Sequence, residues 1–272
     1  MALPTSVLDR TSRYDPLPID TVVADGIGDA LLPLAIGGSL DSLIVSDLHL
    51  GLRASRSAEL LKLLQMLRFE RLILLGDILH DATLRRLSCD DWALIAFLRQ
   101  LRHRADAPAV LPVLGNHDRS CGDLLARLLD RPVTDSVTWT HAGRRYLAVH
   151  GDLFDRFVTR NRRTAQAVSG LFEFCHRRLS RDGRWPHAAD QLHVRWTGLG
   201  RKMAEAALAH ARSHGVDVIF CGHSHQPYSR SDTEDGRSSR PLTYLNTGAW
   251  LGLRPSFVTV AGDGSARLHQ LA

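Results

Sequence analysis

The chain is 272 residues long, and with 44% hydrophobic and 23% charged residues it has the composition of an ordinary globular protein. Its formal net charge is +5 with His neutral, which suits a phosphorylated substrate or an anionic membrane surface but does not require nucleic acid. No apolar run approaches the ~20 residues of a membrane span, and no basic start leads into an apolar signal core. The four cysteines form no CxxC pair, which indicates free thiols in a reducing compartment. We therefore expect a cytoplasmic protein.

The first half of the chain alternates between apolar runs and helical periodicity, after an irregular start. Residues 1–40 carry four prolines, so we expect an irregular extension there, with at most a short edge strand over Ala30–Ile36. The elements predicted next are a strand at Leu43–Ser46, a helix at Ser55–Phe69, a strand at Leu72–Asp77, a helix at Asp91–His103, a strand at Pro108–Leu114 and a helix at Gly122–Leu129. Trp92 is expected on the buried side of its helix.

The second half begins with a predicted hairpin and then changes character. Val137–Thr140 and Arg145–Val149 pair in that hairpin, residues 153–213 indicate helix almost throughout, and the polar stretch Tyr228–Arg240 indicates a hairpin tip. Strand patterns return at 216–221, Leu242–Leu245 and Phe257–Val260. This order predicts one α/β domain over residues 1–272: a sandwich of two mixed sheets with outer helices. The helical insertion of about 153–213 is expected to form a cap over the strand ends.

Polar residues follow five of the apolar runs. They are Asp47 and His49, then Gly76-Asp77, then Gly115-Asn116-His117-Asp118, then His150-Gly151-Asp152, and finally Gly222-His223-Ser224-His225. Because ligands of an open α/β sheet bind outside the carboxyl ends of its strands, these residues predict one site assembled from five strand ends. Carboxylate, amide and imidazole ligands suit Mn, Fe, Zn or Co, and the lack of Cys argues against a structural zinc site.

These five motifs, in this order, resemble those of the calcineurin-like metallophosphoesterases, from Asp47 to about Trp250. The resemblance implies a four-layer sandwich and two divalent metal ions, with Mn as first choice and Fe, Zn, Co and Mg as alternatives. It implies that Asp47, His49 and His225 hold the first metal, that Asn116, His150 and His223 hold the second, and that Asp77 bridges the two. It also implies that His117 acts as general acid or charge stabiliser beside the leaving group, that Asp118 orients it, and that Asn116 touches the phosphate.

A finer resemblance is to the bacterial UDP-2,3-diacylglucosamine pyrophosphatases. It is carried by Ser46–Gly51, by Gly143–Tyr146, by the insertion after Phe154-Asp155 and by Tyr244–Gly248. His117 departs from some of those enzymes, which carry Arg there, and Ala249 stands where relatives often carry an acidic residue. We therefore predict a hydrolase of a phosphoanhydride or phosphodiester, acting on UDP-2,3-diacylglucosamine or a similar nucleotide-linked lipid.

Three alternatives stay open on the sequence alone. The first is a nuclease or a general phosphodiesterase or phosphatase, although 6% aromatic residues offer no obvious base-stacking platform. The second is a scaffold without catalysis, which is disfavoured because no predicted ligand is missing.

The third concerns the basic stretch 151–210, where eleven Arg and Lys stand against six Asp and Glu. This stretch forms either a packed amphipathic helix pair or a cap for a diphosphate or anionic lipid headgroups at a membrane surface.

Two residues next to the Gly76-Asp77 motif have two interpretations. His80 and Asp81 either support a ligand imidazole from behind or belong to an ordinary loop.

Overall fold

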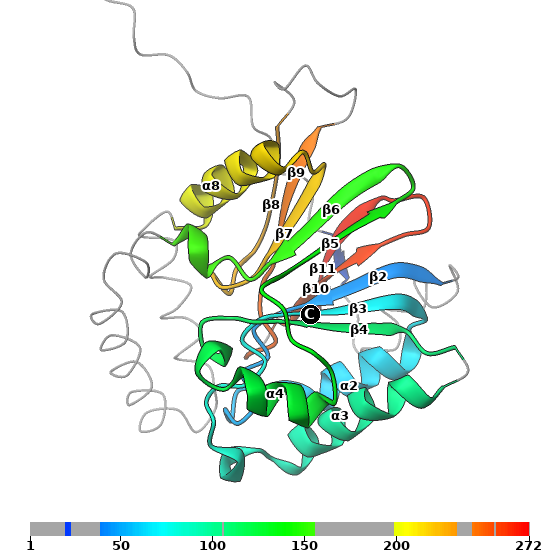
Figure 1. The fold of residues 1–272 in the computed structure, drawn as a ribbon, viewed down its shortest axis with the longest axis vertical. Coiled ribbons are helices and arrows are strands. Elements are labelled where there is room, and N and C mark those ends of the chain that lie inside the picture. Colours follow the sequence, from blue (N-terminus) through cyan, green and yellow to red (C-terminus); the bar gives the residue numbers. More distant parts are fainter. Residues whose placement is uncertain are drawn as a thin grey trace, which may run out of the picture.

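The computed structural model describes residues 20–22, 39–104, 106–155, 199–232, 241–252 and 254–271. These residues form two β-sheets packed face to face, with helices on the outer faces (Figure 1). The predicted strand over Ala30–Ile36, residues 156–198 of the predicted cap and residues 233–240 of the predicted hairpin tip lie outside the described residues.

The first sheet has six strands in the order β1-β11-β10-β2-β3-β4 among the described residues. Their bounds are Asp20–Val22 (β1), Leu40–Val45 (β2), Phe69–Leu75 (β3), Ala109–Val113 (β4), Ser256–Val260 (β10) and Ala266–Leu271 (β11). β2, β3 and β4 run parallel, joined by the helices α2 (Ser57–Met66) and α3 (Cys89–Gln100). Parallel strands need such crossovers, and the crossovers bring the carboxyl ends of all three strands to one edge.

The second sheet has five strands in the order β5-β6-β7-β9-β8, again among the described residues. Their bounds are Ser136–His141 (β5), Arg144–Val149 (β6), Val218–Cys221 (β7), Pro227–Asp232 (β8) and Leu242–Thr247 (β9). β6, β7 and β9 run parallel, and the predicted β5–β6 hairpin is confirmed. β8 pairs antiparallel with β9, so the start of the polar stretch expected to be a hairpin tip is itself a strand.

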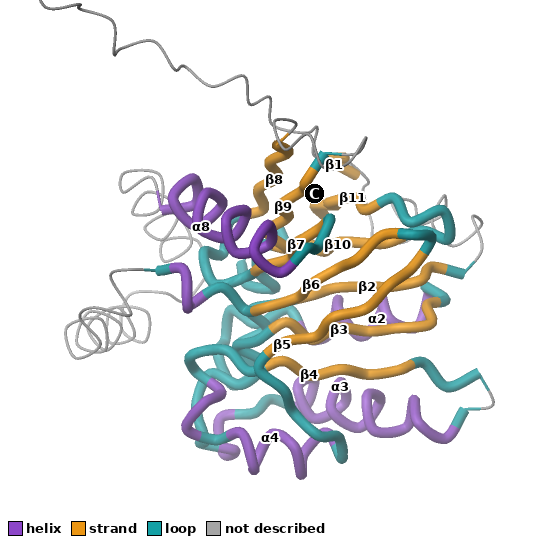
Figure 2. Tube along the Cα trace, turned by 45° about the horizontal axis from the view of Figure 1, so that its top comes forward, coloured by secondary structure: helices purple, strands orange, loops and turns teal. Residues whose placement is uncertain are grey.

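Six shorter or outer elements complete the described fold. They are α4 (Gly122–Leu129), α8 (Leu199–His214) and the 3₁₀ turns Leu84–Arg86, Leu101–His103, Asp118–Ser120 and Asp152–Phe154. α2, α3 and α4 lie on the outer side of the first sheet, and α8 lies on the outer side of the second (Figures 1 and 2). The helix–sheet–sheet–helix order confirms the predicted four-layer sandwich.

The side chains of the second half of β3, Leu72–Leu75, show why this part of its sequence is apolar throughout. Leu72 and Leu74 pack against the helices of the first sheet, whereas Ile73 and Leu75 point to the other face and pack against the second sheet. Successive strand residues face opposite sides, and both sides are covered along Leu72–Leu75, so no position there is left for a polar residue. Asp77 therefore follows the fully buried end of the strand.

Two predictions about the helices need correction. Trp92 is 43% exposed rather than buried, because the buried stripe of α3 runs through Asp91, Leu94, Ile95 and Leu98. Asp91 takes a buried position because its carboxylate accepts two backbone N–H groups. One is that of Ser88, in the capping box at the start of the helix, and the other is that of Gly51. Residues 199–213 of the predicted cap belong to α8, whose Met203, Ala207 and Leu208 pack on the second sheet instead of over the strand ends.

Candidate metal centre

Five loops carry the predicted site residues, and they leave β2, β3, β4, β6 and β7 at the same end of the sandwich. Backbone hydrogen bonds tie the loops to one another. The Asp47 N–H donates to the Gly76 carbonyl at 3.0 Å, and the Gly222 N–H donates to the His150 carbonyl at 2.8 Å. The Trp250 N–H, in the loop after β9, donates to the Asp47 carbonyl at 3.1 Å, so the loops of the two sheets are joined at one site.

Asp47, His49 and His225 form a first group, with one ligand atom from each within 4.8 Å of the others. Nε2 of His225 lies 3.2 Å from Oδ1 of Asp47 and 3.2 Å from Nε2 of His49. The other oxygen of Asp47, Oδ2, accepts the backbone N–H of His223 at 3.0 Å and the hydroxyl of Ser46. Oδ1 is thus the oxygen that faces the His225 imidazole.

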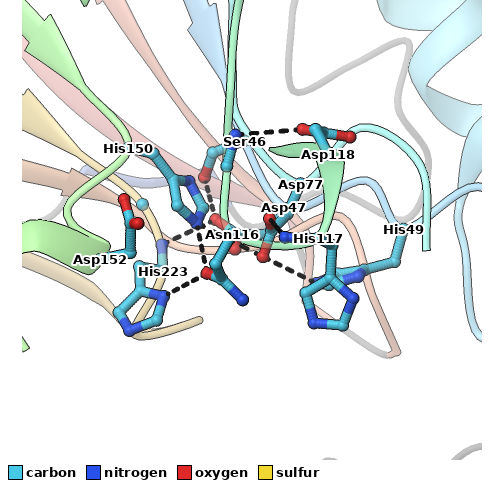
Figure 3. A network of polar contacts seen from close by, with 12 residues as sticks. Ser46, Asp47, His49, Asp77, Asn116, His117, Asp118, His150, Asp152 and His223 are labelled. Atoms are coloured by element: carbon cyan, nitrogen blue, oxygen red, sulfur yellow. Dashed lines mark hydrogen bonds and ion pairs between the residues drawn. The ribbon is translucent and has the colours of Figure 1, made fainter. Parts of the chain in front are cut away.

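A second group, Asp77, His150 and His223, meets the same 4.8 Å criterion. Asn116 lies between the two histidines, because its Oδ1 is 3.2 Å from Nε2 of His150 and 3.0 Å from Nδ1 of His223. Figure 3 shows His150, Asn116 and His223 converging on one side of Asp77, with His49 on the other.

Asp77 stands between the two groups. Its Oδ2 is 3.3 Å from Nε2 of His150 and 3.8 Å from Nε2 of His49. Its Oδ1 accepts the backbone N–H of His117 at 2.9 Å, which fixes the orientation of the carboxylate. One oxygen therefore faces an imidazole from each group, as a carboxylate that bridges two metal ions requires.

The charges at the centre follow from burial and from this carboxylate. Burial opposes a charge on His150, but the Asp77 carboxylate outweighs it and raises the pKa of His150 to about 10. Burial likewise opposes the charge on Asp77, but the His150 imidazole holds the Asp77 pKa well below its usual value. The pKa of His49 is well below its usual value because of its burial. Without a metal, His150 is therefore protonated and pairs with the ionised Asp77 carboxylate.

The backbone at the site adopts conformations that cost energy. Among the described residues, five of the seven non-glycine residues with positive φ are predicted metal ligands: Asp47, His49, Asp77, His223 and His225. Such conformations cost on the order of 1–3 kcal/mol each and cluster at functional sites. Two glycines make room for the ligands, because a Cβ at Gly115 would overlap Oδ1 of Asp77 and a Cβ at Gly222 would overlap Oδ2 of Asp47. The strain and the close packing both point to a site shaped for ligation.

His117 and Asp118 lie beside the first group, but among the described contacts their two side chains do not hydrogen-bond to each other. Nδ1 of His117 donates to the His80 carbonyl at 2.9 Å. The Asp118 carboxylate is fully buried and accepts the backbone N–H groups of Ile78, Leu79 and Gly115 at 3.0–3.2 Å. Burial, with the nearby Asp77 charge, raises its pKa to about 6. Asp118 thus fixes the loops around Asp77, and the His80 carbonyl orients His117.

Several contributors were not identified from the sequence. The hydroxyl of Ser46, which donates to Asp47, also lies 2.6 Å from that of Thr247. Asp155 lies 3.3 Å from Nε2 of His223, and Asp152, three residues earlier, faces Arg119 at 3.4 Å. Only the short runs Ser46-Asp47 and Phe154-Asp155 hinted at these roles, because they adjoin the motifs.

The fold and the donor set are those of a metal-dependent phosphoesterase. Residues 41–227 match the family model of the calcineurin-like phosphoesterases, and the chain belongs to that family. A search of curated proteins found no match. Among the described residues, no helix is long and apolar enough to cross a membrane.

Solved structures that resemble the chain have low sequence identity. Vps29 of Chaetomium thermophilum is 14% identical with a TM-score of 0.43, and the match covers 84% of this chain and 93% of that one. An archaeal phosphodiesterase is 14% identical with a TM-score of 0.39, covering 85% and 99%. The nuclease MPE of Pseudomonas putida is 18% identical with a TM-score of 0.37, covering 84% and 87%.

Proposed function

We propose that the protein is a two-metal hydrolase of a phosphoanhydride or phosphodiester bond. The observation that carries the proposal is the position of Asp77, one oxygen of which faces both histidine groups at 3.3 and 3.8 Å. Asp47, His49 and His225 would hold the first metal, Asn116, His150 and His223 the second, and Asp77 both.

The residues present fit such a pair of ions. A histidine ligand binds the metal through a lone pair on one ring nitrogen, and the N–H of its other ring nitrogen needs an acceptor. Nδ1 of His150 lies 3.0 Å from the Leu75 carbonyl, and Nε2 of His223 lies 3.3 Å from Asp155. Once a metal has displaced the extra proton of His150, both rings would therefore turn a lone pair toward Asn116 and Asp77. Bound divalent ions would neutralise phosphoryl charge and lower the pKa of a water molecule, which makes it a nucleophile near neutral pH.

His117 would serve the leaving group. Because a carbonyl only accepts, the contact of Nδ1 with the His80 carbonyl requires a hydrogen on Nδ1. Nε2 is then the atom that can hold the transferable proton and donate it to the departing oxygen. Asn116 would use its side-chain amide to orient a phosphoryl oxygen, and Asp118 would act indirectly by holding the backbone of Ile78 and Leu79.

The first substrate class to test is a nucleotide-linked lipid such as UDP-2,3-diacylglucosamine. The finer sequence resemblance supports it, as does the basic excess of residues 151–210. Leu153 adds a described apolar side chain, 46% exposed, only three residues after His150. The same features support peripheral contact with an anionic membrane. Sedimentation with anionic lipid vesicles tests this contact, and binding should weaken with salt.

A hydrolysis panel tests the function. It contains the nucleotide-linked lipid, a nucleotide diphosphate-sugar, bis-p-nitrophenyl phosphate and single-stranded DNA, each with Mn²⁺, Mg²⁺, Zn²⁺ and Co²⁺. We expect metal-dependent turnover that is fastest on the lipid. Faster turnover of DNA or of the small diester would replace the lipid proposal with a nuclease or general phosphodiesterase. No turnover of any substrate, with two metals bound, would favour the scaffold.

A further inference from the structure

His80 lies behind the proposed metal site and contacts two of its histidines. Its ring Nδ1 is 3.4 Å from Nδ1 of His49, on the side of the ring away from Asp77. Its backbone carbonyl accepts Nδ1–H of His117 at 2.9 Å. The His80 ring is also stacked on that of His117, with centroids 5.1 Å apart and planes at 29°. The side chain is 6% exposed, so these contacts are shielded from water.

The chain holds His80 in this place from two directions. The His80 N–H donates to the Leu50 carbonyl at 3.1 Å, and the Leu50 N–H donates to the Ile78 carbonyl at 2.9 Å. The loops after β2 and β3 therefore run side by side. The buried Asp118 carboxylate holds Ile78 and Leu79 from the opposite side. Both the ring and the carbonyl of His80 are thus fixed relative to the site.

The contact between His49 and His80 decides whether His49 can bind a metal. Only one of the two facing Nδ1 atoms can carry the shared hydrogen. If His80 carried it, neutral His49 would have its own hydrogen on Nε2, the nitrogen that faces His225 and Asp77. A metal needs a lone pair at that nitrogen. With the hydrogen on Nδ1 of His49, Nε2 has the lone pair.

We propose that His80 is a positioning residue whose ring Nδ1 accepts Nδ1–H of His49 and so turns Nε2 of His49 to the first metal. Its carbonyl holds His117 in the tautomer that leaves Nε2 of His117 for proton transfer. One residue thus supports a metal ligand with its side chain and the general acid with its backbone. The inference rests on the proposed two-metal function.

The alternative for the same residues is a third metal site. Nitrogens of His49, His80 and His117 lie within 4.8 Å of one another. However, Nε2 of His49 already faces the first group, so a third ion would require His49 to lose the hydrogens of both ring nitrogens. Nδ1 of His117 is also engaged by the His80 carbonyl. The geometry favours support of two ions over binding of a third.

Substitutions at His80 can separate its hydrogen bond from its packing. Asn places an acceptor at about the position of Nδ1, so His80→Asn keeps the hydrogen bond without the ring. His80→Phe keeps the stacked ring without the acceptor. All variants keep the backbone carbonyl, and His103→Ala, which replaces an exposed histidine at the end of the Leu101–His103 turn, is a matched control.

The experiment titrates the metal-free full-length proteins with Mn²⁺ and measures free Mn²⁺ by electron paramagnetic resonance. We expect wild type, His103→Ala and His80→Asn to bind two ions with affinities within about threefold of one another. His80→Phe should bind one ion normally and the other about 10–100-fold more weakly, the usual effect of removing such a partner. The ion bound normally shows that this variant is folded.

Three results would overturn the proposal. The first is a His80→Phe variant that binds both ions as wild type does. The second is a His80→Asn variant that loses as much affinity as His80→Phe. The third is three ions in wild type falling to two in His80→Phe, which would indicate the third site.

If wild type binds fewer than two ions, the proposed function fails instead. Histidine ¹⁵N NMR of the metal-free protein still decides about His80, because a hydrogen on its Nδ1 would contradict the proposal.

Discussion

Oδ2 of Asp155 lies 3.3 Å from Nε2 of His223, while Nδ1 of the same ring lies 3.0 Å from Oδ1 of Asn116. His223 therefore has a carboxylate at its outer nitrogen and the proposed second metal position at its inner one. Asp155 is buried, with 5% of its surface exposed, so water weakens this contact little. A carboxylate in that position fixes the tautomer of a ligand histidine and increases its basicity.

Replacing Asp155 should weaken the second metal selectively. We expect Asp155→Ala and Asp155→Asn to lower the affinity for one of two Mn²⁺ ions by about 10–100-fold, measured by titration of the metal-free protein. Asp152→Asn is the control, because that carboxylate lies on the same turn but faces Arg119. Unchanged affinity for both ions in Asp155→Ala would show that the pair has no part in ligation.

Replacing Asp77 should affect both metals together. Its Oδ2 is the oxygen that faces His49 and His150 at once, so Asp77→Ala removes a ligand from each proposed ion. We expect loss of tight binding of both ions by elemental analysis, and no detectable turnover. Two ions retained per chain by the variant would exclude Asp77 as the bridging ligand.

Replacing His117 should affect chemistry but not metal content. Its ring lies beside the first group and contacts the His80 carbonyl and the rings of His49 and His80. We expect His117→Ala to keep two ions and to lose about 10²–10⁴-fold in kcat, the range of general acid–base groups. The loss should be smaller for p-nitrophenyl esters, whose leaving group needs no proton. Equal losses for good and poor leaving groups would indicate charge stabilisation instead.

The main features of the fold could be predicted because they rest on local patterns. The second half of β3, Leu72–Leu75, is buried on both faces, so its sequence is a continuous apolar run. β8 and β11 were missed because β8 is a polar strand at the sheet edge and β11 mixes polar with apolar residues. The exposure of Trp92 was also missed, because Asp91 takes the buried helix position through a capping bond that periodicity does not reveal.

The proposed ligands could be named from the sequence because each follows a strand end within a short motif. Their supporting residues could not. His49 and His80 are 31 residues apart, and Asp155 and His223 are 68 apart, so their pairing depends on how separate loops meet. Asp118 adjoins His117 in sequence, yet its carboxylate points to the backbone of another loop. Adjacency in a motif does not fix the direction of a side chain.

Asp118 should therefore matter for the stability of the loops. Its carboxylate accepts three backbone N–H groups, and Asp118→Asn would turn an NH₂ group toward at least one of these donors. We expect a loss of about 1–3 kcal/mol in the free energy of unfolding, the cost of an unsatisfied buried polar group. Urea denaturation of the metal-free protein measures it, with the exposed Asp123→Asn as control. Equal stability of the two variants would contradict the role.

Binding of the second metal should depend on pH through His150. The pKa of His150 is raised to about 10 in the metal-free site, where Asp77 outweighs the effect of burial. Below that pH the ring holds an extra proton, and a metal must displace it, because only a neutral imidazole ligates. The affinity for the second metal should therefore rise with pH. The rise should be about tenfold per pH unit between pH 6 and 9 for the release of one proton.

The variant His225→Ala isolates this step, because it lacks a ligand of the first group. We expect Mn²⁺ binding to this variant to release about one proton at pH 7.5. Calorimetry in two buffers of different ionisation enthalpy measures the release. His49 differs, because its burial lowers its pKa and leaves the ring neutral at that pH. Equal heats in the two buffers would mean that no proton leaves, and His150 would then not be the nitrogen that the metal occupies.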